Sequence, residues 1–160
     1  MHLSENAMVV PENQQPLLEA WFDGVCEPVN PGGHAAYGAV VLRGGKELLR
    51  EGGYVGHGEG MSNNVAEYAG VLRVLEFLAT LDGPALIRGD SKLVISQLTG
   101  EWKAKKGLYL DRYRQAVALV ARLGSRVRLE WVGRDQNSLC DDLSKQVLRD
   151  RGIRFRIQRE

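Results

Sequence analysis

The spacing of apolar positions changes along the chain, and each change predicts a boundary between secondary-structure elements. Residues 17–22 form an apolar run that predicts a strand, which we expect to end at Asp23-Gly24. Two further strand-like runs, 35–42 and 46–55, flank Arg43-Gly44-Gly45, an arrangement typical of a β-hairpin. The first part of the chain is therefore predicted to form antiparallel strands.

The remainder of the chain alternates between helical and strand spacing. Between residues 64 and 81, apolar residues recur at the spacing of a helix with a wide buried face. Beyond it, the pattern predicts a strand at 85–89, a helix at 92–98, a helix at about 108–123, a strand at 126–132 and a final helix at 137–148. Strands joined through helices become parallel neighbours. We therefore predict an α/β domain with a mixed sheet.

A chain of 160 residues can form one well-filled core but is too short for two ordinary domains. Residues 1–17 contain no lysine or arginine, so they match neither a signal nor a targeting peptide. We expect a flexible extension at 1–17, one domain at 18–149 and a basic tail at 150–160. The tail alternates apolar and basic residues, which predicts an added edge strand, a phosphate contact or a disordered end.

Composition gives further expectations about the environment of the protein. No stretch reaches the roughly 20 apolar residues of a membrane-spanning helix. Cys26 and Cys140 are far apart in sequence and provide no disulfide framework. We expect a cytoplasmic protein with free thiols and no membrane partner, and we expect it to be a monomer.

The net charge of +1 conceals an uneven distribution. Residues 1–27 contain five acids and no lysine or arginine, whereas residues 102–128 contain eight basic residues and one acid. A polyanion-binding face beside a metal-binding pocket would have this asymmetry. A solvated, charged helix face is the alternative explanation of the basic run.

Four acidic residues lie at predicted junctions between elements, namely Asp23, Glu67, Asp90 and Asp141. Sites in open α/β sheets form beyond the carboxyl ends of strands, where acids after strands and at helix starts can meet. Such carboxylates could bind two divalent ions about 4 Å apart, as a metal-dependent phosphodiesterase requires. Hard ions such as Mg²⁺ prefer oxygen ligands of this kind.

Each of these acids also has a structural explanation. Glu67 and Asp141 end sequences that resemble capping boxes, and Asp90 could cap the helix that follows it. A buried, hydrogen-bonded aspartate is the alternative for Asp23. Glu67, however, shares a helical face with apolar Val71, so its carboxylate is expected at the edge of the core, where it needs a partner or a metal. Capping and metal binding are compatible interpretations.

Five short motifs follow one another between about residues 19 and 149. They are Asp23-Gly24, Asn30-Pro31-Gly32, Ser62-Asn63-Asn64-x-x-Glu67, Gly89-Asp90-Ser91 and Asn137-x-x-Cys140-Asp141-x-Leu143. In this order and at these intervals, they resemble the motifs of type 1 ribonuclease H. The resemblance implies a five-stranded mixed sheet flanked by helices, with antiparallel early strands and parallel later strands.

The same resemblance implies an endonuclease that hydrolyses the RNA strand of RNA–DNA hybrids. Two Mg²⁺ ions, with Mn²⁺ as an alternative, would be held by the four acids named above and would supply the catalysis without a nucleophilic side chain. Asp142 is a rival for the last position. The acid that directly follows Cys140 matches the family motif, however, and this favours Asp141.

Further residues are expected to contact the hybrid by resemblance or by charge. RNA is distinguished from DNA through its 2′-hydroxyl groups, and a glycine-rich turn lets the backbone approach them closely. An ordinary turn is the alternative for this sequence. The expected substrate-binding residues are Asn30, Gly32, Asn63 and Ser91, together with a basic segment of Trp102, Lys103, Lys105 and Lys106 that would contact the DNA backbone.

One departure from the family concerns the loop before the final helix. Residues 133–136 lack the histidine that many members carry there, and Arg134 and Asp135 are the candidates for assisting turnover. A solvent-exposed turn without such a role is the alternative. His34 and His57 are expected at the surface or in loops rather than as metal ligands.

Two other functions are compatible with this pattern. A noncatalytic hybrid-binding module would be expected to lose at least one of the four acids, yet all four are present. A DNA-directed nuclease of the same fold is the second alternative, against which the sequences Asn30-Pro31-Gly32 and Asn63-Asn64 argue.

Overall fold

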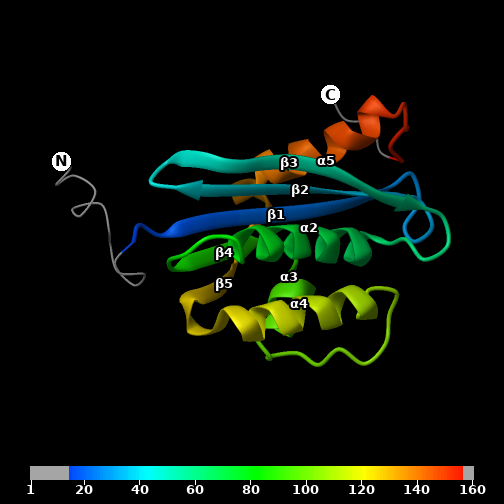
Figure 1. Cartoon of the computed structure of the whole chain (residues 1–160). Coiled ribbons are helices and arrows are strands. Elements are labelled where there is room, and N and C mark those ends of the chain that lie inside the picture. The colour runs from blue at the N-terminus through cyan, green and yellow to red at the C-terminus, as the bar shows by residue number, and fades with distance from the viewer. Residues whose placement is uncertain (1–14, 157–160) are drawn as a thin grey trace.

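A computed structural model describes residues 15–156 as a five-stranded sheet with helices on both faces (Figure 1). The strand order is β3-β2-β1-β4-β5. The strands are β1 (Leu18–Glu27), β2 (His34–Arg43), β3 (Lys46–His57), β4 (Ala85–Gly89) and β5 (Val127–Trp131). The α-helices of the described part are α2 (Asn63–Leu78), α3 (Lys92–Leu98), α4 (Leu110–Leu123) and α5 (Ser138–Asp150).

The sheet is mixed, as predicted. The strands β1, β2 and β3 pair antiparallel, and the β2–β3 turn uses Gly44 and Gly45 with φ of 58° and 78°. These angles are accessible to glycine at little cost. On the other side, β1 pairs parallel with β4, and β4 pairs parallel with β5. The predicted hairpin and the predicted fold class are both confirmed.

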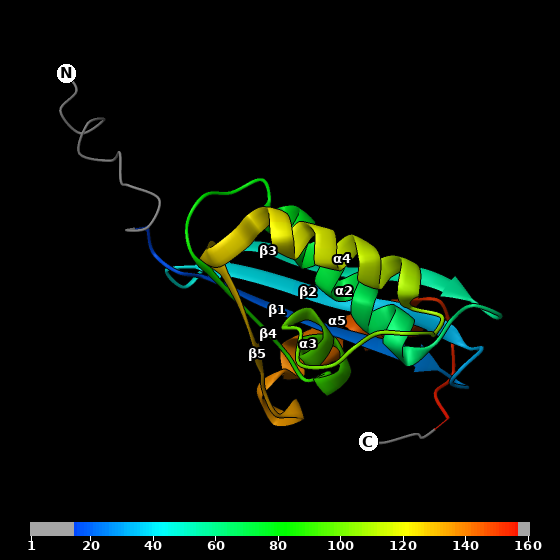
Figure 2. The ribbon, with the colours of Figure 1, turned by 90° about the horizontal axis from the view of Figure 1, so that it is seen from below.

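The helices divide between the two faces of the sheet (Figure 2). Helix α2 packs against β1 and β2, and α4 packs on α2, whereas α5 covers β1, β2 and β3 from the opposite side. The main core lies between α2 and the sheet and includes Phe22, Tyr68 and Leu75, all fully buried. A smaller apolar cluster around Leu148 joins α5 to Val25 and Ala36.

The prediction for the first strand was wrong at its carboxyl end. We expected it to stop at Asp23-Gly24, because aspartate and glycine are depleted in strands. Instead β1 continues to Glu27, and Asp23 lies in its interior opposite Gly38 of β2. Pairing with β2 on one side therefore outweighs the local preference. The first helix also ends earlier than expected, at Leu78 rather than at residue 81.

The ends of the chain were assigned to extensions, and these domain boundaries stay predictions. Residues 1–14 and 157–160 lie outside the described part of the chain. Within the described part of the tail, 151–156 form no strand, and Ile153 and Phe155 pack against the smaller apolar cluster. Among the described residues, no helix is long and apolar enough to cross a bilayer.

Candidate metal centre and its nucleic-acid groove

Three of the four predicted acids converge to within ligand distance of a common ion. One carboxylate oxygen from each of Asp23, Glu67 and Asp90 lies within 4.8 Å of the others. Asp23 and Glu67 are buried, with 4% of each residue exposed. The fourth acid, Asp141, lies outside this tight group but lines the same cavity.

The ends of the central strands place Asp23 and Asp90 side by side. The parallel register between β1 and β4 ends at the pair Phe22 and Gly89. The next residue along the chain from each of these is one of the two aspartates, Asp23 within β1 and Asp90 just beyond β4. This is the carboxyl edge of the parallel pair, where sites in α/β sheets form. Asp23 reaches it from within β1, because β1 continues beyond the end of β4.

Close packing of α2 on β1 brings Glu67 to the same point. A Cβ atom at Gly24 would lie 2.3 Å from the backbone nitrogen of Glu67, so only glycine permits this approach. Ser62 begins the helix, because its Oγ accepts a hydrogen bond from the backbone N–H of Val65 at 3.1 Å. The capping-box explanation of Glu67 is therefore wrong. Its carboxylate takes no part in capping α2.

Helix α5 supplies Asp141 from the other face of the sheet. A Cβ atom at Gly38 would lie 2.3 Å from the carbonyl oxygen of Cys140, so a glycine of β2 is again required for the approach. The side chain of Asn137 anchors the start of α5, because its Nδ2 donates to the carbonyl oxygen of Phe22 at 2.8 Å. Asp141 pairs with Lys145 one turn further along, with Nζ and Oδ2 2.8 Å apart.

Helix capping explains neither Asp141 nor Asp90. Asn137, rather than Ser138, precedes α5 and its side chain makes no capping hydrogen bond. At α3 the cap is Ser91, whose Oγ accepts from the backbone N–H of Val94 at 3.2 Å. Asp142, the rival of Asp141, is exposed and is absent from the cavity lining.

The acids perturb one another strongly. Burial, reinforced by the charge of Asp90, raises the pKa of Asp23 to about 8 against a lowering hydrogen bond from the Gly24 N–H. Burial also raises the pKa of Glu67 well above its usual range, and Asp23 adds to this. The pKa of Asp90 is raised as well, chiefly by burial. Like charges held together in this way are unfavourable unless protons or cations neutralise them.

The donor set fits a hard divalent cation. Among the described residues, Glu67 Oε1 is buried and has no hydrogen-bond partner, which leaves a polar atom in need of one. Oxygen ligands from several carboxylates are what Mg²⁺ and Mn²⁺ bind in proteins. The acids form one side of a cavity of about 570 Å³ whose other walls carry Asn63, Arg134 and residues of α5 and the tail.

The predicted substrate-binding turn lies beside this cavity. Asn30 Oδ1 accepts a hydrogen bond from the backbone N–H of Asn63 at 2.9 Å, which joins the turn to the start of α2. Gly32 has φ of 102°, a conformation that favours glycine, and its N–H donates to the carbonyl oxygen of Met61. Asn63 itself lines the cavity.

The basic segment lies apart from the acids, between α3 and α4. Trp102, Lys103, Lys105 and Lys106 are all exposed, and none lines the cavity. Trp102 is held through its backbone N–H, which donates to the carbonyl oxygen of Ser96 at 2.9 Å. The segment therefore forms an exposed surface separate from the cavity.

Of the two residues expected to assist turnover from the loop before α5, only Arg134 lines the cavity. Arg134 lines the cavity, and its charge opposes the rise in the pKa values of Glu67 and Asp90. Asp135 is exposed and does not line the cavity. The histidines were expected at the surface or in loops. His34 and His57 lie in β2 and β3 rather than in loops, and their rings stack on each other with centroids 3.7 Å apart. Cys26 and Cys140 are free cysteines, as predicted, and both are buried.

Sequence reasoning missed several contributors to the site, among them Gly38 and Arg156. Gly38 carries no local signal for function, since its importance arises only from the approach of α5. Arg156 lines the cavity although it is 133 residues from Asp23 along the chain. The basic character of the tail was the only signal that could have indicated it.

A mixed sheet that carries clustered carboxylates at its parallel edge defines the ribonuclease H-like class, and comparison with known proteins agrees. The family model described as reverse transcriptase-like matches residues 22–147. The bifunctional protein Rv2228c of Mycobacterium tuberculosis is 37% identical over 120 residues, which cover 74% of this chain and 32% of that protein. Ribonuclease HI of Halobacterium salinarum is 38% identical over 96 residues, covering 59% of this chain and 46% of that enzyme.

Solved structures show the same relationship. The N-terminal RNase H domain of Rv2228c has a TM-score of 0.74 at 35% identity, covering 86% of this chain and 96% of that one. RNase H1 of Halobacterium salinarum has a TM-score of 0.72 at 31% identity, covering 84% and 98%. The chain belongs to the reverse transcriptase-like family of ribonuclease H-like proteins, and its resemblance to type 1 ribonuclease H is confirmed. It spans less than half the length of the curated relatives described above.

Proposed function

We propose that this protein is an endoribonuclease that hydrolyses the RNA strand of RNA–DNA hybrids with the help of two divalent ions. The observation that carries the proposal is the cluster of buried Asp23, buried Glu67 and half-buried Asp90 at one wall of a large polar cavity. The names of its relatives, a ribonuclease HI and an RNase H domain, support the same activity.

The chain's own residues would hold the ions. Asp23, Glu67 and Asp90 offer converging oxygens, and Asp141 faces the same cavity from α5. Bound Mg²⁺ or Mn²⁺ would supply an activated water and neutralise charge at the scissile phosphate. Asp141 would exchange its ion pair with Lys145 for metal coordination, and the freed ammonium would then face the substrate phosphates.

Selectivity for RNA would come from the turn beside the cavity. The backbone around Gly32 can approach a 2′-hydroxyl closely, and Asn30 and Asn63 fix this turn to the start of α2. The 2′-hydroxyl both donates and accepts, so it identifies an RNA strand in a hybrid. Because Asn63 lines the cavity that holds the acids, the strand that is recognised would also be the strand that is cut.

The test is cleavage of three labelled duplexes of the same sequence: an RNA–DNA hybrid, duplex RNA and duplex DNA. Each is incubated with and without Mg²⁺. We expect internal cuts in the RNA strand of the hybrid alone, and only with the metal. Binding of the hybrid without cleavage would identify a noncatalytic binding module, and cleavage of duplex DNA would identify a DNA-directed nuclease. Either result would overturn the proposal.

A further inference from the structure

Two arginines near the end of the chain line the acid-containing cavity without taking part in the proposed hydrolysis. Arg149 lies in the last turn of α5, and Arg156 lies in the segment that follows it. Together with Lys145 they make the wall contributed by α5 and the tail strongly basic. Lys145 is ion-paired with Asp141 and Arg156 with Glu27, whereas Arg149 has no carboxylate partner among the described residues. The proposed hydrolysis gives neither arginine a role.

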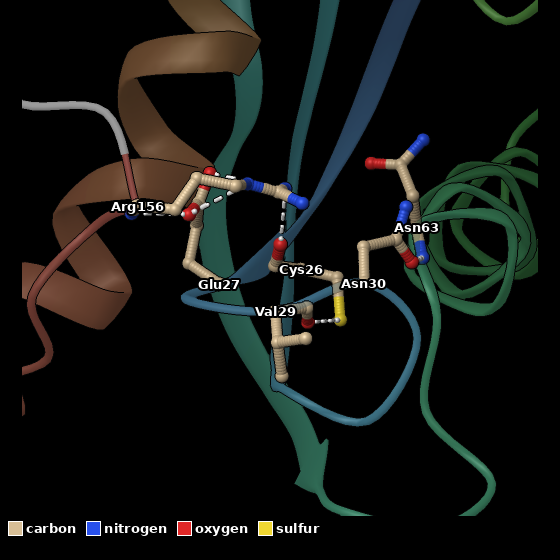
Figure 3. A network of polar contacts seen from close by, with 6 residues as sticks. All are labelled: Cys26, Glu27, Val29, Asn30, Asn63 and Arg156. Carbon is tan, nitrogen blue, oxygen red and sulfur yellow. Dashed lines mark hydrogen bonds and ion pairs between the residues drawn. The ribbon is translucent and has the colours of Figure 1, made fainter.

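Arg156 is fixed by contacts with the end of β1 (Figure 3). Its backbone N–H donates to Glu27 Oε1 at 2.9 Å, and its Nη2 donates to the carbonyl oxygen of Cys26 at 2.8 Å. Nε lies 3.3 Å from Glu27 Oε1. The side chain nevertheless remains 44% exposed, and within the described range 15–156 no acceptor contacts Nη1. Part of the guanidinium is therefore held in place yet available.

Arg149 is supported by an aromatic ring rather than by an acid. Its guanidinium carbon lies 5.2 Å from the centroid of the Phe155 ring. No carboxylate of the described residues lies within ion-pair distance of it. Stacking on an aromatic face leaves the N–H edge of a guanidinium free for an anion. An unpaired cation beside a polar cavity is expected to attract one.

The position of Arg156 relates this pair to the predicted substrate turn. Figure 3 shows its guanidinium over Cys26, with Asn30 and Asn63 on the far side of that residue. Cys26 and Glu27 directly precede the turn, and Asn63 lines the same cavity as Arg149 and Arg156. The two arginines, the acids and Asn63 therefore share one cavity, and Arg156 contacts the end of the strand that precedes the turn.

We propose that Arg149 and Arg156 form a phosphate-binding site for the RNA strand, separate from the scissile position. The inference rests on the proposed function and assigns the strand, because both arginines share a cavity with the acids that would cut it. The exposed basic segment between α3 and α4 shares no part of that cavity and serves the other strand. Guanidinium groups bind phosphate through paired, charge-assisted hydrogen bonds.

The first experiment compares Arg149→Gln and Arg156→Gln with a matched control, Arg151→Gln. Arg151→Gln removes the same charge close to Arg149 in the sequence, but the Arg151 side chain stacks on Tyr54 and does not line the cavity. We expect each cavity variant to raise the KM for the hybrid about tenfold, with kcat nearly unchanged, and to lower the slope of log affinity against log salt by about 0.9. Arg151→Gln should behave as wild type. Arg149→Gln removes no polar contact of the fold, so it tests the site even if Arg156→Gln is unstable.

The second experiment assigns the strand. Two series of hybrids each carry a single uncharged methylphosphonate linkage. In the first series the linkage moves along the RNA strand, and the nucleotide beside it is 2′-O-methylated. In the second series it moves along the DNA strand. One RNA linkage away from the cut should raise the KM of the wild type, and Arg149→Gln should abolish this sensitivity. Wild-type KM in both cavity variants, or a sensitivity confined to the DNA strand, would overturn the inference while hybrid cleavage persists. Absence of Mg²⁺-dependent cleavage by the wild type would instead overturn the proposed function, and the inference with it.

Discussion

Asp23→Asn should stabilise the metal-free protein while abolishing metal-dependent activity. The substitution keeps the shape of the side chain, and its Oδ1 can still accept the hydrogen bond that Asp23 receives from the Gly24 N–H at 2.9 Å. The new amide can also donate to Glu67, whose buried Oε1 has no partner among the described residues. The variant removes a carboxyl group that must take up a proton, or bury a charge, when the protein folds near neutral pH.

The magnitude follows from the pKa of Asp23. Its folded-state pKa of about 8 exceeds the ordinary value of 3.8, so its contribution to stability is fully present below pH 3.8 and is lost as pH rises toward 8. At pH 7 about three pH units of this range have been crossed, which corresponds to about 4 kcal/mol at 1.36 kcal/mol per unit. The value of about 4 kcal/mol is an upper limit, because Asp23 and Glu67 titrate together and a proton bound by Glu67 lowers the cost of ionising Asp23. It is still a large fraction of the roughly 5–15 kcal/mol by which domains are stable.

The assay is urea unfolding in EDTA at several pH values between 5 and 8. The free energy of unfolding of Asp23→Asn should exceed that of the wild type by a margin that grows with pH, by up to about 1.4 kcal/mol per unit. With saturating Mg²⁺ the order should reverse, because only the wild type gains binding energy. Asp142→Asn, an exposed neighbour outside the cavity, is the control. A margin independent of pH would refute the argument.

Three further predictions concern packing, substrate binding and turnover. Gly24→Ala should lower the free energy of unfolding by about 2 kcal/mol or more, because the new Cβ would lie 2.3 Å from the Glu67 backbone nitrogen. Chemical denaturation measures this loss, and an unchanged free energy of unfolding would contradict the close approach of α2 to β1. Replacing Lys103, Lys105 and Lys106 by alanine should raise the KM for the hybrid and flatten its salt dependence by up to about one unit of slope per lost contact, and an unchanged slope would show that the segment is not used. Arg134→Ala should slow multiple turnover by roughly ten- to a hundredfold and single turnover less, whereas Asp135→Asn, outside the cavity, should retain nearly full rates; the reverse order would contradict the placement of this loop.

Local patterns sufficed to predict most of the fold. Helical and strand spacing located every described strand and α-helix, and the glycines of the β2–β3 turn identified the hairpin. The end of β1 was not predictable in this way, because Asp23-Gly24 favours a turn locally and only pairing with β2 keeps it extended. The sequence of a single strand does not contain that information.

The site was only partly accessible from sequence for the same reason. Short motifs identified the acids, since each lies at a recognisable junction or in a family pattern. The contact between Arg156 and Glu27 spans 129 residues, and nothing near either residue indicates the other. Likewise, Gly38 acquires its role only when α5 approaches β2. Long-range contacts of this kind depend on the assembled fold.

The most direct test of the account is the rate of RNA-strand cleavage in an RNA–DNA hybrid as Mg²⁺ is titrated, for wild type and Glu67→Gln. Glu67 carries the unpartnered buried oxygen of the cluster, and Gln preserves its size while removing its charge. We predict saturable, metal-dependent cleavage by the wild type and loss of most of that rate in Glu67→Gln, with Asp142→Asn close to wild type. Wild-type rates in Glu67→Gln at every Mg²⁺ concentration would contradict a metal centre at these acids.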